Sequence, residues 1–298
     1  MAHPGWSAGP HRRSLICSHS STRLEEKAHD MPYQRMRELW DADRPALGGW
    51  VVSGSEFALG VFRRAGFDYV GIDCQHSVSS EATAAEWLAR TPPGTVPTIV
   101  RVSKNDTAYI GRLADAGADG IIVPMVNTPE DAAAAVGAVR YPPGGARSFG
   151  PIGVGLPVSD LDALAARVAV FVMIETAEAL DNVAAIAAVP GLAGIYVGPA
   201  DLSIALGMNP MRAFSSDQLI EPFERIRAAC EASNIVLGLH TLNASGARQW
   251  IERGARMVTL GSDTGMLLSA ASNELGAART VGDETSHSVE SSATPYGR

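Results

Sequence analysis

The stretch VFVMIETAEALDNVAAIAAVPGLAGIYVGPADLSIAL, residues 170–206, decides the predicted fold. It reads as an apolar strand, a helix and a second apolar strand, and an acid follows each strand, Glu175 in the first case and Asp201 in the second. Unbroken apolar runs of about five residues are typical of parallel strands that are buried on both faces. The stretch therefore predicts a strand–helix–strand unit of a parallel α/β fold, with both acids at the carboxyl ends of neighbouring strands.

Two carboxylates at neighbouring strand ends favour a hard divalent cation such as Mg²⁺ or Mn²⁺, with Co²⁺ as a further candidate. The alternative is that each acid caps a helix, since Asp201 opens the run DLSIALG and Glu175 precedes Thr176. The equivalent position of the two acids after buried strands favours the metal site over capping alone.

The apolar pattern repeats along the chain and predicts eight strands. We expect these strands over residues 47–52, 69–72, 98–100, 120–123, 170–174, 194–197, 236–239 and 257–260. Helices are expected over residues 33–41, 56–65, 80–90, 108–116, 129–139, 177–188, 216–232, 244–253 and 263–279. Eight strand–helix units predict a single-domain (β/α)8 TIM barrel. An open doubly wound sheet is the weaker alternative, because no glycine-rich dinucleotide motif follows the first strand.

Short sequence features mark the boundaries of this domain. Residues 1–32 are polar and without periodicity, which predicts a disordered leader, and Met31 is an alternative start. The barrel is expected over residues 33–280, and the Ser/Thr/Glu-rich residues 281–298 predict a disordered tail. The Pro/Gly-rich segment 141–157 is expected to be a long loop that serves the site.

Composition narrows the class of protein. The 298 residues are 46% hydrophobic, and the formal net charge is −8 with scattered acids, which argues against nucleic acid as a partner. No apolar run approaches the roughly 20 residues that cross a membrane. The three cysteines have neither disulfide nor zinc spacing, so a cytoplasmic location is expected.

Candidate catalytic residues follow the second, third and seventh predicted strands. His76 lies three residues after Asp73 and is a natural general base, with a surface loop residue as the alternative. Arg101 ends the third strand, where it either binds a substrate anion or pairs with Glu175 or Asp73. His240 ends the seventh strand and either reaches the pocket or lies in a plain loop.

The lysine content bears on the mechanism. The chain has two lysines, Lys27 in the leader and Lys104 in a loop, and no predicted strand contains one. Aldolases that form a Schiff base need a lysine inside the barrel. If the protein generates a carbanion next to a carbonyl, a metal must stabilise the enolate instead.

Several motifs in this order resemble those of one enzyme family. They are GFDY (66–69), IDCQH (72–76), VR (100–101) with ND (105–106), VPMV (123–126), RYPPG (140–144), IET (174–176), VGPADLS (197–203) and GSDT (261–264). Residues 45–279 resemble the HpcH/HpaI aldolases, the metal-dependent pyruvate aldolases. The resemblance implies a modified TIM barrel and a homo-oligomer, a hexamer built from dimers that exchange their last helix.

The resemblance also implies roles for individual residues. Glu175 and Asp201 match the metal ligands, His76 the general base, and Arg101 the group that stabilises the enolate-like transition state and binds substrate. Asp115, which by pattern alone is a helix-surface acid, matches the acid that raises the basicity of that histidine. The substrate-binding set it implies is Arg101, Met173, Gly198, Pro199, Ala200 and Asp201, with the amides of Ala200 and Asp201 on the pyruvate carboxylate.

Departures from the family pattern concern the substrate. Met173 stands where a substrate-binding glutamine is common, and methionine cannot donate that hydrogen bond. The predicted activity is cleavage of 4-hydroxy-2-oxo acids into pyruvate, or a related 2-oxo acid, and an aldehyde. The alternatives are a CoA-thioester lyase of the citryl or malyl type and a non-catalytic barrel that binds a metabolite.

Overall fold

The computed structural model describes residues 32–91, 96–150, 161–214 and 217–279. The leader predicted over residues 1–32 lies outside this part of the chain except for Pro32, and so does the tail predicted over residues 281–298.

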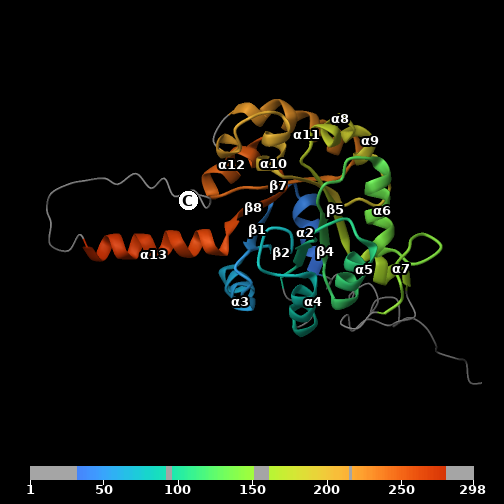
Figure 1. Cartoon of the computed structure of the whole chain (residues 1–298), viewed down its shortest axis with the longest axis horizontal. Coiled ribbons are helices and arrows are strands. Elements are labelled where there is room, and N and C mark those ends of the chain that lie inside the picture. Colours follow the sequence, from blue (N-terminus) through green and yellow to red (C-terminus); the bar gives the residue numbers. More distant parts are fainter. Residues whose placement is uncertain (1–31, 92–95, 151–160, 215–216, 280–298) are drawn as a thin grey trace, which may run out of the picture.

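Eight parallel strands form a closed barrel in which each strand pairs with the next and β8 pairs with β1 (Figure 1). The strands are β1 (Ala46–Val51), β2 (Tyr69–Asp73), β3 (Thr98–Arg101), β4 (Gly120–Val123), β5 (Ala169–Ile174), β6 (Gly194–Val197), β7 (Val236–His240) and β8 (Met257–Ser262). All eight predicted strands are present, so the predicted (β/α)8 TIM barrel is confirmed. Their carboxyl ends meet at one mouth of the barrel.

Helices surround the barrel and cover its outer face (Figure 1). They are α2 (Pro32–Asp41), α3 (Glu56–Ala65), α4 (Glu81–Arg90), α5 (Thr107–Ala116), α6 (Pro129–Val139), α7 (Leu161–Ala166), α8 (Ala177–Asp181), α9 (Val183–Ala187), α10 (Pro199–Ala205), α11 (Ile220–Ser233), α12 (Ala244–Glu252) and α13 (Asp263–Arg279). None of the helices in the described ranges combines the length and apolarity that a membrane crossing requires.

Two predictions for helices need correction. The helix expected over residues 177–188 is divided into α8 and α9 at Asn182, whose side-chain amide donates to the Asn127 carbonyl at 2.9 Å. The helix expected from residue 216 begins as α11 at Ile220, after a short 3₁₀ turn over Asp217–Leu219.

A repeated Ala-Gly-x-Asp sequence sets the junction between helix and strand. Gly66 and Gly117 end α3 and α5 with φ of 90° and 107°, the left-handed region that glycine enters without strain. The aspartates that follow, Asp68 and Asp119, each accept a hydrogen bond at 2.9 Å from a backbone amide at the start of a neighbouring strand. The motif thus ends a helix and fixes the amino end of a strand pair.

Large side chains fill the barrel interior beneath the carboxyl ends of the strands. The indole of Trp50 stacks on the ring of Tyr196 with centroids 6.0 Å apart, and both residues are buried. Gly71 makes room for this indole, since a Cβ there would lie 2.0 Å from Trp50 Cε3. The hydroxyls of Tyr69 and Tyr196 both hydrogen-bond Thr259 Oγ1 deeper in the barrel, at 2.9 and 2.6 Å. This rigid layer is the floor of the site.

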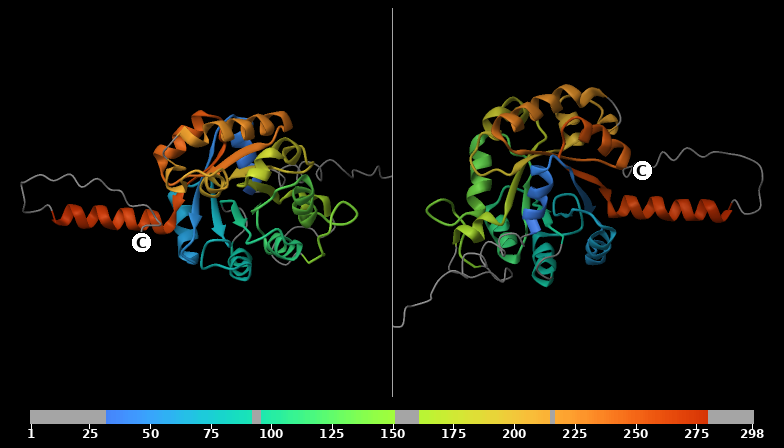
Figure 2. Two further views of the ribbon diagram at one scale, coloured as in Figure 1. Left: turned by 45° about the horizontal axis from the view of Figure 1, so that its top comes forward. Right: turned by 180° about the vertical axis from the view of Figure 1, so that it is seen from behind.

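The last helix leaves the barrel. Figures 1 and 2 show α13 projecting away from the other elements. Its first residue, Asp263, accepts hydrogen bonds from the backbone amides of Val52 and Ser53, which fixes the start of the helix beside β1. No residue of α13 is buried, and Leu267 is 71% exposed.

Candidate active site at the carboxyl end of the barrel

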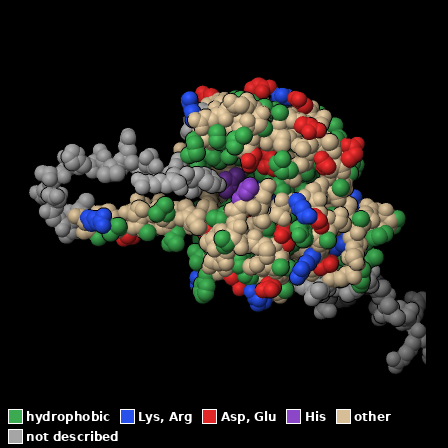
Figure 3. All heavy atoms as spheres, in the orientation of Figure 1, with side chains coloured by type: hydrophobic (Ala, Val, Ile, Leu, Met, Phe, Trp, Pro, Cys, Tyr) green, Lys and Arg blue, Asp and Glu red, His purple; other side chains and the backbone are tan. Residues whose placement is uncertain are grey.

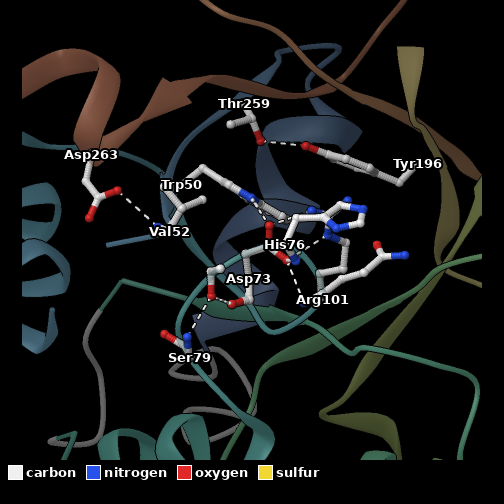
Figure 4. Close-up of polar contacts among 11 residues, drawn as sticks. Trp50, Val52, Asp73, His76, Ser79, Arg101, Tyr196, Thr259 and Asp263 are labelled. Atoms are coloured by element: carbon white, nitrogen blue, oxygen red, sulfur yellow. Dashed lines mark hydrogen bonds and ion pairs between the residues drawn. The ribbon is translucent and has the colours of Figure 1, made fainter. Parts of the chain in front are cut away.

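An ion pair between the ends of two neighbouring strands forms one side of the site. Asp73 and Arg101 are register partners at the ends of β2 and β3. Arg101 donates from Nε to Asp73 Oδ1 at 2.9 Å and from Nη2 to Oδ2 (Figure 4). The amides of Gln75 and His76 also donate to Oδ1, and Trp50 Nε1 points at Oδ2 from 3.4 Å. This bidentate pair fixes the orientation of the guanidinium.

The hydrogen bonds and opposite charges of Asp73 and Arg101 favour the ionised form of both groups. Burial by itself raises the pKa of Asp73, but the hydrogen bonds and charge of Arg101 outweigh it and lower the pKa overall. Burial likewise opposes the charge of Arg101, while Asp73 raises its pKa above the usual value. Nη1 of Arg101 makes no hydrogen bond with any residue of the described ranges. The arginine is therefore paired with Asp73, one of the two predicted carboxylates, and keeps one edge for a ligand.

His76 lies in the loop after β2, beside this pair. Its backbone amide donates to Asp73, whereas its imidazole is exposed at the mouth and hydrogen-bonds no residue within the described ranges. Figure 4 shows the imidazole next to Arg101. An imidazole without a hydrogen-bonding partner in the described ranges, beside a fixed cation, is placed as a proton acceptor for a bound substrate would be.

Glu175 forms the opposite side of the site. It follows β5, is 2% exposed, and its Oε1 accepts a hydrogen bond from the Met125 amide at 2.7 Å. Burial raises its pKa, and the negative charge of Asp201 raises it further, while the Met125 amide and Arg101 act in the other direction. A buried carboxylate held close to a second acid is a position that a cation would stabilise.

Neither acid caps a helix in the way the alternative required. Thr176 is the N-cap of α8 and its hydroxyl accepts from the Ala179 amide, so Glu175 is left outside the helix. Gly198 is the N-cap of α10, and Asp201 lies in the first turn. Both carboxylates are thus available to a ligand at the mouth.

The donor set fits a divalent metal that is completed by substrate and water. Glu175 directly follows β5, and Asp201 lies in the first turn of α10, which follows the neighbouring strand β6. Both offer the oxygen ligands that Mg²⁺ and Mn²⁺ prefer. Among the described residues no three His, Cys, Asp or Glu side chains gather into a cluster that could hold a metal. Magnesium sites that use only one or two carboxylates are common, because the ion retains water and substrate oxygens.

Gly198 sits directly against the candidate metal ligand. A Cβ atom at Gly198 would lie 2.8 Å from Glu175 Oε2 and 2.9 Å from Met173 Cε. Met173 is buried at 1% exposure, so its side chain has little space into which it could move. Its position beside Gly198 puts it under the edge of the site. The glycine therefore lets the free oxygen of Glu175 occupy its position.

We expect Gly198→Ala to reduce kcat/KM for retro-aldol cleavage by roughly a hundredfold, because the new methyl group displaces the carboxylate of Glu175. The φ of −97° at Gly198 is open to alanine, so the protein should still fold. Gly60→Ala is the matched control, since a Cβ there meets no atom within 4 Å. Equal activity of both variants would show that this contact is unimportant.

Asp115 lies away from His76 and from the mouth of its own barrel. It is near the end of α5, and its Oδ1 accepts from Nε and Nη2 of Arg147 at 3.1 and 2.7 Å. α5 begins at the mouth and runs about 1.5 Å per residue toward the other end of the barrel, so Asp115 is more than a helical turn below His76. The structure does not bring these two side chains together within one chain.

The predicted site loop is also displaced from the mouth. Its described part, residues 141–150, follows helix α6 rather than a strand, and Arg147 places it beside the end of α5. This part of the loop therefore lies at the amino end of its own barrel, so within one chain it does not reach the site. Residues 151–157 lie outside the described ranges.

Two aromatic side chains complete the site. Trp50 is not among the residues that the sequence predicts for the site, and no sequence pattern marks it. Arg101 Cζ lies 5.6 Å from its ring centroid, and the His240 ring lies 5.7 Å away at an interplanar angle of 73°. His240 thus reaches the pocket, which resolves the alternative that the sequence left open.

Known proteins resemble this chain over most of its length. Residues 47–270 match the family model for HpcH/HpaI aldolase/citrate lyase. A hydroxypyruvate/pyruvate aldolase of Rhizorhabdus wittichii is 34% identical over 249 residues, 83% of this chain and 99% of that protein. A 4-hydroxy-2-oxo-heptane-1,7-dioate aldolase of Salmonella paratyphi A is 34% identical over 242 residues, 79% of this chain and 90% of that protein.

A solved structure shares the fold over most of its length. An HpcH/HpaI aldolase/citrate lyase family protein from Burkholderia cenocepacia J2315 superposes with a TM-score of 0.74 at 32% identity, covering 83% of this chain and 98% of that one. The family model spans the barrel from β1 into α13 and includes every candidate site residue. This chain belongs to the HpcH/HpaI aldolase/citrate lyase family.

Proposed function

We propose that the protein is a divalent-metal-dependent aldolase that cleaves 4-hydroxy-2-oxo acids into pyruvate, or a related 2-oxo acid, and an aldehyde. The observation that carries this proposal is the buried Glu175, whose free oxygen faces Gly198 and whose pKa is raised by burial and by Asp201. Curated relatives named as pyruvate aldolases support the reaction class. Mg²⁺ or Mn²⁺ is the proposed ion.

Each residue has a task in this reaction. When the bond between carbons 3 and 4 breaks, its electron pair moves into the 2-oxo acid and negative charge builds on the keto oxygen. The free edge of Arg101 donates to that oxygen. His76 accepts the proton of the 4-hydroxyl group, and protonation of carbon 3 then releases the 2-oxo acid. A divalent cation held by Glu175 and Asp201 would supply positive charge beside the same oxygen.

The substrate carboxylate is assigned to the start of α10. The amides of Ala200 and Asp201 lie in the first helical turn after Gly198 and Pro199, where backbone N–H groups have no partner within the helix. With this assignment the carboxylate binds on the side of the site that carries Glu175, and the keto oxygen lies between Glu175 and Arg101. Met173 contributes an apolar wall there rather than a hydrogen bond.

The lysines support metal rather than imine chemistry. Lys104 has a side chain that is 62% exposed, pairs with Asp106 at 3.2 Å, and lies over the ring of Tyr109. It is a surface residue of the loop between β3 and α5. Lys27 lies outside the described residues.

The direct test is a coupled assay in which lactate dehydrogenase reports pyruvate released from a panel of 4-hydroxy-2-oxo acids. We expect EDTA to abolish turnover and Mg²⁺ or Mn²⁺ to restore it. Full activity in EDTA would contradict the metal assignment. Turnover of citryl- or malyl-CoA in place of the 4-hydroxy-2-oxo acids would favour the CoA-thioester lyase, and failure to turn over any of them would favour a binding barrel.

We propose further that the protein is a homo-oligomer, a hexamer built from three dimers, in which α13 packs on a second copy. The exposed Leu267, Leu268 and Leu275 on a helix that projects from its own barrel support this arrangement. Sedimentation velocity should give a species several times larger than the 31.2 kDa chain, and Leu267→Glu with Leu268→Glu should reduce its size. A wild-type protein that sediments at 31.2 kDa would contradict the proposal.

In such an assembly Asp115 can act on His76 only from a neighbouring subunit, because its own chain holds it against Arg147 near the other end of the barrel.

The cytoplasmic location expected from the cysteines stays a proposal. Both free cysteines of the described ranges, Cys74 and Cys230, are buried, and burial raises the pKa of each thiol to about 12. These thiols are inert packing groups.

A further inference from the structure

His240 is a polar group at the mouth of the barrel to which the proposed mechanism gives no task. It ends β7, next to β6, whose end carries Gly198 and α10. The described residues contain two histidines, His76 and His240, and Figure 3 shows histidine side chains gathered in the hollow of one face. His240 therefore lies at the same end of the barrel as the catalytic candidate His76.

The imidazole is neutral and without a hydrogen-bonding partner. Burial and the positive charge of Arg101 lower the pKa of His240, Asp73 offsets them only in part, and the resulting pKa is about 4. A neutral imidazole has one nitrogen that donates and one that accepts. Neither nitrogen is hydrogen-bonded to a residue of the described ranges, which leaves both for a ligand.

The ring is held in a fixed place. It makes a T-shaped contact with the ring of Trp50, and that indole is itself fixed by stacking on Tyr196 and by the contact of Nε1 with Asp73. Arg101 lies over the same indole. His240 and the arginine that addresses the keto oxygen are therefore positioned by one rigid side chain.

We propose that His240 is a specificity-determining residue that hydrogen-bonds a hydroxyl group on carbon 3 of the 2-oxo acid. This inference rests on the proposed function, because it concerns the donor that the aldolase binds. His240 is partly buried against the same indole as Arg101, the residue proposed to address the keto oxygen of the 2-oxo acid, whereas His76, the proposed base for the 4-hydroxyl group, is exposed. A donor without the hydroxyl leaves the desolvated imidazole unpaired, which selects against it.

The test compares hydroxypyruvate with pyruvate as donors toward one aldehyde, using kcat/KM for each. His240→Leu and His240→Phe keep an apolar contact with Trp50 but cannot hydrogen-bond the donor. We expect both variants to lower the ratio of kcat/KM for hydroxypyruvate to kcat/KM for pyruvate by roughly tenfold or more. His240→Gln restores a neutral donor and acceptor and should return the ratio to within about threefold of the wild type.

An unchanged ratio in both apolar variants, with wild-type turnover of pyruvate, would overturn the role of His240 and leave only packing against Trp50. A change confined to the choice between glycolaldehyde and acetaldehyde would overturn the assignment to the donor. A wild-type protein without metal-dependent turnover of either donor would instead contradict the proposed function. Circular dichroism of each variant establishes that the ratios come from folded protein.

Discussion

Replacement of Glu175 by Gln is expected to lower kcat for retro-aldol cleavage by roughly 10³-fold, since the charge stabilisation that a bound metal supplies is worth several kcal/mol. The substitution keeps the size of the side chain and an oxygen that can accept from the Met125 amide. It removes the negative charge that would hold the ion. The fold should persist, because the carboxylate is already destabilised by burial and by Asp201.

The control is Glu178→Gln, which makes the same chemical change three residues later on the exposed face of α8. Its kcat should equal that of the wild type. Metal titration of Glu175→Gln, followed by activity, should show no recovery at concentrations that saturate the wild type. Activity of Glu175→Gln at the wild-type rate would remove Glu175 from the metal site.

Arg101→Lys should lower kcat by roughly 10²- to 10³-fold with a smaller change in KM. The guanidinium uses Nε and Nη2 to hold Asp73 and leaves Nη1 for the substrate oxygen. A lysine has a single ammonium group and cannot reproduce that fork, although it keeps the charge that Asp73 needs. The loss falls on kcat because the negative charge on the keto oxygen develops only as the bond breaks.

Arg90→Lys is the matched control, since Arg90 pairs with Glu56 on the exposed surface, with 3.0 Å between Nη2 and Oε2. It should leave kcat and KM unchanged. Thermal unfolding of Arg101→Lys should remain cooperative, because Asp73 retains a cationic partner. A variant that loses substrate binding but keeps kcat would show that Arg101 only anchors the ground state.

The fold follows from the sequence because a parallel barrel buries each strand on both faces. Such strands read as unbroken apolar runs, and the Ala-Gly-x-Asp repeats mark where helices end. The break at Asn182 is invisible in the sequence, since it depends on a hydrogen bond to Asn127, 55 residues away. The placement of residues 141–150 at the amino end follows from helix α6, which the sequence does predict over residues 129–139, because a segment that follows a helix starts at that end of the barrel.

The sequence predicts those residues of the candidate site whose charged side chains stand at the end of a buried strand. Glu175 and Arg101 each stand directly at the end of a buried strand, so their common location needs only the fold. Trp50 could not be assigned because its role arises from contacts with Tyr196, Arg101 and His240, which come from three other strands. The partner of Asp115 depends on the path of a loop, so the pairing with Arg147 has no sequence pattern.

The account depends on one divalent cation between Glu175 and Asp201, and anomalous diffraction from a crystal grown with Mn²⁺ and oxalate tests it most directly. The oxalate dianion is a planar mimic of the enolate of a 2-oxo acid. The account predicts a manganese peak about 2.1 Å from a carboxylate oxygen of each residue, with oxalate completing its coordination and Arg101 Nη1 donating to it. A peak elsewhere, or two carboxylates turned apart with no peak between them, would contradict the account.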